Sequence, residues 1–282
     1  MSTFSLKIVA LIFMVIDHIG QFIPDTPIWF RYIGRLSAPL FMFTMVFGFS
    51  YTRNRKIYII RMYLFSVGMA IMDYILNCFN NVGDEVTNNI FATLFSIVVI
   101  IRLIEFKREN NRKWKFYLSC FCIWQMISLI ICYNIGVHFD NLGLVFVAFM
   151  GNVFYDEGGF IFVVLGILLY YVKDNKKNTA TFYSLFCLIY AFIINTNLVP
   201  RIMTRLDYYG YDLLYNIFNF VFSILGFDVL GFRQNTFQWM MIGALPFMLL
   251  YNGNKGKSMK YFFYIFYPLH IFILFILSNM VL

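Results

Sequence analysis

The stretch FSLKIVALIFMVIDHIGQFI, residues 4–23, decides the fold class of this protein. A helix needs about 20 mostly apolar residues to cross the roughly 30 Å hydrocarbon layer of a bilayer, and this stretch is long enough. Similar blocks recur along the 282-residue chain, in which 61% of the residues are hydrophobic and 13% are charged. Soluble domains carry about 25% charged residues. The sequence therefore predicts an all-α, polytopic integral membrane helical bundle and excludes a soluble domain.

Lys and Arg residues indicate how the apolar blocks cross the membrane. They gather in short loops at residues 53–56, 107–115, 173–177 and 255–260. Short basic loops stay in the cytoplasm. Block length and the alternation of basic with non-basic loops predict about nine transmembrane spans in a single domain over residues 1–282. The same rule predicts a cytoplasmic N-terminus and a C-terminus outside the cell.

Two apolar segments, residues 142–154 and residues 211–227, interrupt this alternation. The first has about 13 residues, too few to cross the bilayer. Successive cytoplasmic loops require an even number of crossings between them, so neither segment fits as a full span. We expect both segments to be re-entrant or interfacial on the outer side.

Composition and motifs argue against several function classes. The net charge is +8, but basic residues that flank apolar blocks are explained by membrane orientation, so we expect no nucleic-acid partner. The five cysteines lack the spacing of zinc or redox sites, and we expect no metal. The absence of G-x-S-x-G, Walker and H-E-x-x-H motifs argues against a serine hydrolase, a nucleotide-driven pump and a zinc protease.

Charged side chains within the apolar blocks are the first candidates for function, because a charge at membrane depth is costly and rare. Asp17 and His18 lie in the first block, and Arg35 lies in the second. Counted from the outer ends of their spans at about 1.5 Å per residue, they differ in depth by only a few Å. We therefore expect a carboxylate, an imidazole and a guanidinium to meet in the outer half of the membrane.

Three further polar residues extend this set of candidates. Asp73 lies near the outer end of the third block, and Asn89 opens the fourth at a similar depth. His270 lies in the last block, two residues after Pro268, which lacks a backbone N–H and favours a local kink. These three residues form a second tier behind Asp17, His18 and Arg35.

More than one chemistry suits these residue types. His18 is a candidate general base, because imidazole titrates near neutral pH, with Asp17 as its orienting or charge partner. Arg35 is a candidate for holding an anion or stabilising a developing negative charge. The same residue types form proton relays in transporters, and a buried Asp–Arg pair can simply join two helices. Residue types alone leave these alternatives open.

Several separated motifs also give the chain a family likeness. They are Leu6–Ile8, Met14–Gly20, Ile33–Leu36, Pro39–Phe41, Thr52–Arg55, Tyr58, Arg61, Leu250–Gly253 and Lys260–His270, with weaker matches at Asn89–Leu94 and Asp156–Gly159. In these motifs the chain resembles the TraX family, the conjugative-pilin N-acetylase family, which is distantly similar to the membrane acyltransferase superfamily. The chain departs from the family pattern at Ser37-Ala38 and in its apolar additions at 142–154 and 211–227.

The resemblance implies an acyltransferase, an O- or N-acetyltransferase of the bacterial plasma membrane. It would move an acetyl group from cytosolic acetyl-CoA across the lipid bilayer to an extracytoplasmic acceptor. The acceptor would be a peptide N-terminus, as in a pilin-like protein, or a hydroxyl group of a surface glycan. A proton-coupled transporter or flippase is the alternative, and the broken segments at 142–154 and 211–227 favour it, because transporters use discontinuous helices.

The basic turn after the second block is a candidate site for the acetyl donor. Arg53, Arg55, Lys56 and Arg61 would suit the phosphates of CoA. The tendency of basic loops to stay in the cytoplasm explains the same residues without any ligand.

Overall fold

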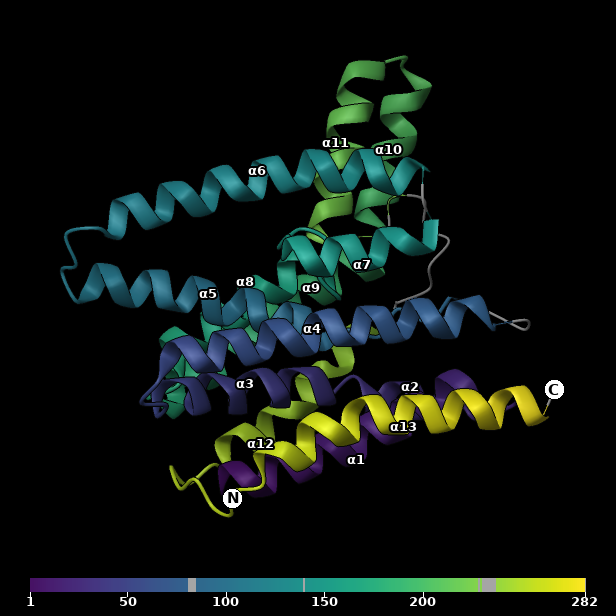
Figure 1. Ribbon diagram of the computed structural model, residues 1–282. Coiled ribbons are helices and arrows are strands. Elements are labelled where there is room, and N and C mark those ends of the chain that lie inside the picture. The colour runs from purple at the N-terminus through teal and green to yellow at the C-terminus, as the bar shows by residue number, and fades with distance from the viewer. Residues whose placement is uncertain (81–84, 139, 228, 230–236, 282) are drawn as a thin grey trace.

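The computed structural model describes residues 1–80, 85–138, 140–227, 229 and 237–281, and this part of the chain is helical throughout, without strands (Figure 1). Most helices are α-helices, joined by short connections, and one is a 3₁₀ helix, η1. In chain order they are α1 (Thr3–Phe22), α2 (Trp29–Gly34), α3 (Ser37–Ser50), α4 (Arg55–Cys78), α5 (Ile90–Arg108), α6 (Trp114–His138), α7 (Asp140–Met150), α8 (Gly159–Val172), α9 (Lys176–Asn195), α10 (Leu198–Tyr208), α11 (Asp212–Leu225), η1 (Gln238–Ala244), α12 (Leu245–Leu249) and α13 (Lys260–Val281).

Polar residues directly before the long helices fix where those helices begin. The Ser2 side chain accepts a hydrogen bond from the backbone N–H of the first turn of α1, and Asn54 and Asn89 do the same for α4 and α5. Asn175 accepts two such bonds at the start of α9. Each cap satisfies an N–H group that has no partner within its own helix.

Six helical stretches in the described part of the chain are long and apolar enough to cross a membrane. They are Thr3–Phe22, Trp29–Ser50, Arg55–Cys78, Trp114–Ile135, Lys176–Asn195 and Tyr261–Met280. This finding agrees with the expected helical membrane bundle, but the predicted count of about nine spans is not confirmed. The fourth predicted span corresponds to α5, a 19-residue helix that carries Arg102, Glu105, Lys107 and Arg108 in its second half. Gly159–Val172, Asp212–Leu225 and Gln238–Leu249 are apolar but shorter.

The two segments that interrupted the loop alternation form short helices. Residues 142–154 fall in α7, which has 11 residues, and in the turn that follows it. Residues 211–227 fall largely in α11, which has 14 residues. Helix α11 pairs with α10 in a hairpin that contacts α8 and α9 and crosses the direction of the other helices (Figure 1). Both helices are shorter than a full span requires.

The first and last helices pack together at the centre of the site described below. Helix α1 contacts α2, α3 and α13, and α3 also packs against α8 (Figure 1). The start of α1 is tied to the chain just before α13, because the backbone N–H of Thr3 donates to Asn254 O at 2.8 Å and that of Phe4 donates to Lys255 O at 3.1 Å.

The basic connections gather at one end of the bundle, which we call the basic end. Arg55 pairs with Glu105 of α5 at 3.2 Å, and Arg108 bonds the Tyr170 hydroxyl at 3.3 Å. Lys173 shares a cavity with Asn252, close to the N-terminus. This clustering agrees with the loop pattern seen in the sequence.

Candidate functional site

Asp17 on α1 is held by two arginines. Arg35 Nη2 lies 2.7 Å from both Asp17 carboxylate oxygens, and Arg31 Nη1 lies 3.1 Å from Oδ1. Arg35 also donates from Nη1 to Gln238 Oε1 at 3.0 Å and from Nε to Arg31 O at 3.2 Å. The network therefore joins α1, α2 and η1, and most donors of Arg35 are already used.

Gly34 lets α2 approach α1 closely enough for this network to form. A Cβ atom built on Gly34 would overlap the side chain of Asp17. Glycine is the only residue without a Cβ, and it serves where two backbones must come close.

His18 lies against His270, from opposite ends of the sequence. His18 Nδ1 and His270 Nε2 are 2.6 Å apart, and the rings stack with centroids 4.9 Å apart. His270 Nδ1 is 2.9 Å from the carbonyl oxygen of Phe266. Both histidines are buried. Asp17 was the expected orienting or charge partner of His18, whereas the hydrogen bond of His18 in the described structure is made with His270.

This chain of hydrogen bonds fixes which ring nitrogens carry protons when both histidines are neutral. A carbonyl oxygen only accepts, so His270 Nδ1 donates to Phe266 O, and His270 Nε2 is then an acceptor. His18 Nδ1 must therefore donate to it, which leaves the lone pair on His18 Nε2. No residue in the described part of the chain hydrogen-bonds His18 Nε2. That atom has the properties of a general base.

The histidine cluster consists of Asp17, His18, Arg31, Arg35, Gln238 and His270.

Tyr267 connects the histidine cluster to two more carboxylates. Its ring lies 6.2 Å from that of His18, and its hydroxyl is within electrostatic range of Asp73 and Glu157. Asp73 on α4 is buried, and its Oδ1 has no hydrogen-bond partner in the described structure. Asp73 thus lies near the histidine cluster, as its depth along the third apolar block suggested.

Glu157 comes from the turn between α7 and α8. The residue as a whole is exposed, and its carboxylate is within electrostatic range of Arg35 and Asp17. The Asn89 backbone lies near that carboxylate, and Thr93 Oγ1 donates to Glu157 O at 2.9 Å. The turn is therefore held against the start of α5, next to the histidine cluster.

Asn89 uses its side chain for local structure. Its Oδ1 accepts the N–H of Ala92 as the cap of α5, and its Nδ2 donates to Ser66 O at 2.9 Å.

The four basic residues proposed for CoA lie at the basic end, in different settings. Arg55 pairs with Glu105 and donates to the carbonyl oxygens of Phe49, Ser50 and Thr52. Arg61 lies over the rings of Tyr261 and Tyr264 at 5.9 and 5.8 Å. Arg53 and Lys56 are exposed.

A narrow apolar cavity of about 70 Å³ runs beneath the histidine cluster. Its walls come from α1, α3, α4, α5 and α13, and they include Lys7, Met14, Met62, Phe91 and Tyr267. Tyr267, whose ring lies 6.2 Å from that of His18, lines this cavity, but none of the six residues of the histidine cluster does.

Sequence reasoning missed four residues of this site: Arg31, Gln238, Glu157 and Tyr267. Arg31 and Gln238 lie near span ends, where polar residues are common and carry no signal. Glu157 lies outside the apolar blocks that were searched. Its only signal was the weak family match of the turn Asp156–Gly159, in which Gly158 and Gly159 both have positive φ, 81° and 70°.

Metal-binding groups are absent from the residues that the structure describes: no three His, Cys, Asp or Glu side chains lie together.

Burial raises the pKa of Asp156, in the turn before α8, to about 7. One of its carboxylate oxygens, Oδ2, has no hydrogen-bond partner among the described residues.

Comparison with known proteins gives two matches. A family model described as TraX protein matches residues 2–211 and 160–278. The probable fimbrial assembly protein FimC, serogroup H1, of Dichelobacter nodosus is 37% identical over 70 residues, covering 23% of this chain and 29% of that protein. The chain thus aligns with less than a third of that relative's length. No solved structure gives a significant match.

Proposed function

This chain belongs to the TraX family, and on that premise we propose that it is a membrane-embedded acetyltransferase. It would take the acetyl group from acetyl-CoA and transfer it to an amine or hydroxyl group of an acceptor on the other side of the bacterial plasma membrane. The basic end would face the cytoplasm, with the N-terminus inside and the C-terminus outside.

The observation that carries the proposal is the hydrogen-bonded chain from Phe266 O through His270 to His18. It presents the lone pair of His18 Nε2 in a buried, polar layer of the bundle. A base in that position suits proton removal from an attacking amine or hydroxyl. His270 is then a positioning residue, because it orients His18 without touching the acceptor.

The reaction balances with these residues. The acceptor nitrogen or oxygen attacks the thioester carbonyl carbon while its proton moves to His18 Nε2. The C–S bond breaks as the tetrahedral intermediate collapses, and the proton passes from His18 to the CoA thiolate. Arg31 is the cation available for the developing oxyanion, since it is half-buried and its Nη2 and Nε make no hydrogen bond to a described residue. Arg35 holds Asp17 in place.

Glu157 would bind the acceptor. It lies beside the histidine cluster, and the residue as a whole is exposed. A carboxylate attracts the ammonium group of a peptide N-terminus. The name of the Dichelobacter nodosus relative, a probable fimbrial assembly protein, supports a pilin-like acceptor, and a surface glycan is the alternative.

The test follows labelled acetyl-CoA in membranes that contain the protein, with CoA release and label in peptide, glycan and lipid fractions as readouts. His18→Ala should lower the rate by roughly 10²–10⁴-fold, the usual contribution of a general base. His270→Gln should cause a smaller loss of kcat with little change in KM. The matched control is His138→Ala, the third histidine, at the end of α6. Equal rates for His18→Ala and the wild type would refute the role of His18.

A proton-coupled transporter or flippase is the second candidate. Asp73 favours it, because a buried carboxylate with an unpartnered oxygen inside a span is typical of proton relays. It predicts proton-coupled flux and no acetylated product. The same experiment separates the two functions, because only the acetyltransferase releases CoA.

A further inference from the structure

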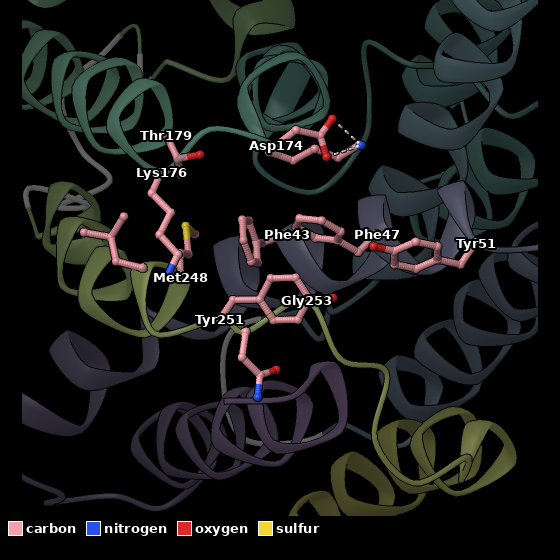
Figure 2. A pocket seen from close by; sticks show the side chains of 12 residues that line it. Phe43, Phe47, Tyr51, Asp174, Lys176, Thr179, Met248, Tyr251 and Gly253 are labelled. Atoms are coloured by element: carbon pink, nitrogen blue, oxygen red, sulfur yellow. Dashed lines mark hydrogen bonds and ion pairs between the residues drawn. The ribbon is translucent and has the colours of Figure 1, made fainter.

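The basic end of the bundle contains a cavity of about 360 Å³, which we call the lysine cavity (Figure 2). Small-molecule sites span roughly 300–1,000 Å³, so this cavity is large enough for part of a cofactor-sized ligand. Its walls come from α3, the connection between α8 and α9, and the end of α12. They include Phe43, Phe47, Tyr51, Lys173, Lys176 and Tyr251.

One wall of the lysine cavity is aromatic. Figure 2 shows Phe43, Phe47 and Tyr51 in a row, with Tyr251 below them. The ring of Phe47 lies 4.5 Å from Tyr251 and 6.3 Å from Tyr51, and the first two rings are tilted while the second pair is stacked. The Tyr51 ring is 62% exposed. An exposed ring that continues an aromatic row is suited to stack against a flat heterocycle.

A second wall carries Lys173, Asp174 and Lys176. Lys176 is exposed and makes no ion pair with a described residue, while Lys173 is held by Asp174 at 2.8 Å and lies over the Phe47 ring at 5.4 Å. The 20-residue helix α9 begins at this wall. The positive end of its dipole adds to the lysine charges, and together they favour a phosphate.

The third wall is a rigid turn. Gly253 has φ +81°, a left-handed conformation that glycine adopts without strain. The N–H of Asn252 donates to Met1 O at 2.9 Å, and the Thr3 hydroxyl donates to the Tyr251 hydroxyl at 3.1 Å. The wall belongs to the family motif Leu250–Gly253, to which the proposed reaction gives no role.

We propose that the lysine cavity binds the adenine ring and phosphates of CoA. This assignment rests on the proposed use of acetyl-CoA and names a different site from the basic turn at residues 53–61. The aromatic row would stack on adenine, and Lys176, which has no ion-pair partner among the described residues, would hold the phosphates. Arg55 is less suited to that role, because Glu105 and three backbone carbonyls occupy it.

The position of the cavity fits a long donor molecule. Phe47 lies ten residues after Ser37, where α3 begins beside Arg35, so roughly 15 Å of helix separates the cavity from the histidine cluster. The long, flexible pantetheine arm of CoA would extend along this stretch. The nucleotide would stay at the basic end while the thioester approached His18.

The test measures binding of desulfo-CoA, which cannot react, to the purified full-length protein. Lys176→Glu should weaken binding about tenfold or more through charge reversal. Tyr51→Ala should weaken it about tenfold through lost base stacking. Lys177→Glu is the matched control, because this neighbouring exposed lysine does not line the cavity, and it should change binding by less than about threefold. Unchanged thermal stability of the variants would show that they fold.

Each outcome supports or overturns the assignment. Normal binding by Lys176→Glu and Tyr51→Ala, with weak binding by Arg53→Gln combined with Lys56→Gln, would move the site to the basic turn and leave the acetyltransferase proposal standing. Displacement of desulfo-CoA by phosphatidylglycerol, with no effect of Tyr51→Ala, would identify a lipid-phosphate site instead. Failure of the wild type to bind desulfo-CoA would overturn both the site and the proposed function.

Discussion

The histidine cluster and the lysine cavity both combine charged and polar groups, but they differ in how far these are paired. In the histidine cluster, both oxygens of Asp17 are bound by Arg35, which is itself fixed by Gln238. In the lysine cavity, Lys176 has no ion-pair partner among the described residues. Paired groups hold a geometry, whereas unpaired groups are available to a ligand. The histidine cluster is therefore held in a fixed geometry, whereas the lysine cavity keeps a lysine without an ion pair.

The largest expected effect on stability comes from removing one partner of the ion pair in the histidine cluster. Arg35→Met would leave Asp17 with Arg31 alone and should lower the free energy of unfolding by roughly 3–5 kcal/mol, because it leaves a buried charge under-compensated. The measurement is denaturant unfolding in detergent. Lys176→Met, in the lysine cavity, is the control, and its free energy of unfolding should stay within about 0.5 kcal/mol of the wild-type value. Equal losses for the two variants would remove the distinction between the two ends.

A smaller effect is expected from forcing α1 and α2 apart without touching a charge. Gly34→Ala places a methyl group where the Asp17 side chain lies, and such overpacking should lower the free energy of unfolding by about 3 kcal/mol. Gly68→Ala is the matched control within a span, because a Cβ there meets no atom within 4 Å. A Gly34→Ala protein as stable as Gly68→Ala would contradict the close approach of the two helices.

The smallest effect concerns Asp156, which is buried like the histidine cluster but incompletely paired. Burial raises its pKa to about 7 in the folded protein, above the value near 4 of an unfolded chain. Its contribution to stability is therefore present at low pH and is lost as pH rises through about 7.

Asp156→Asn removes this titration. The wild type should lose about 2 kcal/mol of stability between pH 5 and pH 8 that the variant keeps. Thermal unfolding midpoints across this pH range give the measurement. Asp212→Asn, at the exposed start of α11, is the control, and its pH profile should match that of the wild type. Parallel profiles for Asp156→Asn and the wild type would contradict a raised pKa.

Composition and hydropathy were sufficient to predict a helical membrane bundle, because apolar length is a direct physical requirement of the bilayer. The number of spans was harder to predict from the sequence. Helix α5 carries four charges near its end, and α8, α11 and the η1–α12 segment are apolar but short. Hydropathy alone does not decide whether such helices count as full spans.

The depth of residues along their spans predicted part of the site. Depth does not tell in which direction around the helix axis each side chain points. Asp17 and His18 are neighbours in sequence, but adjacent residues on a helix point in different directions. One accordingly contacts Arg35 while the other contacts His270. Glu157 was out of reach for a different reason: it comes from a turn, and turns leave no periodic signal.

The pairing of His18 with His270 also joins two residues that the ribosome synthesises at different times. The two residues are 252 positions apart, so at roughly 5–20 residues per second the ribosome needs about 13–50 s to deliver the second after the first. During that interval the His18 imidazole lacks its His270 partner, whereas Asp17 gains Arg31 and Arg35 within the next 18 residues. Under the proposed function, a copy truncated before α13 would lack His270 and should show no acetyl transfer, which the labelled acetyl-CoA assay would measure.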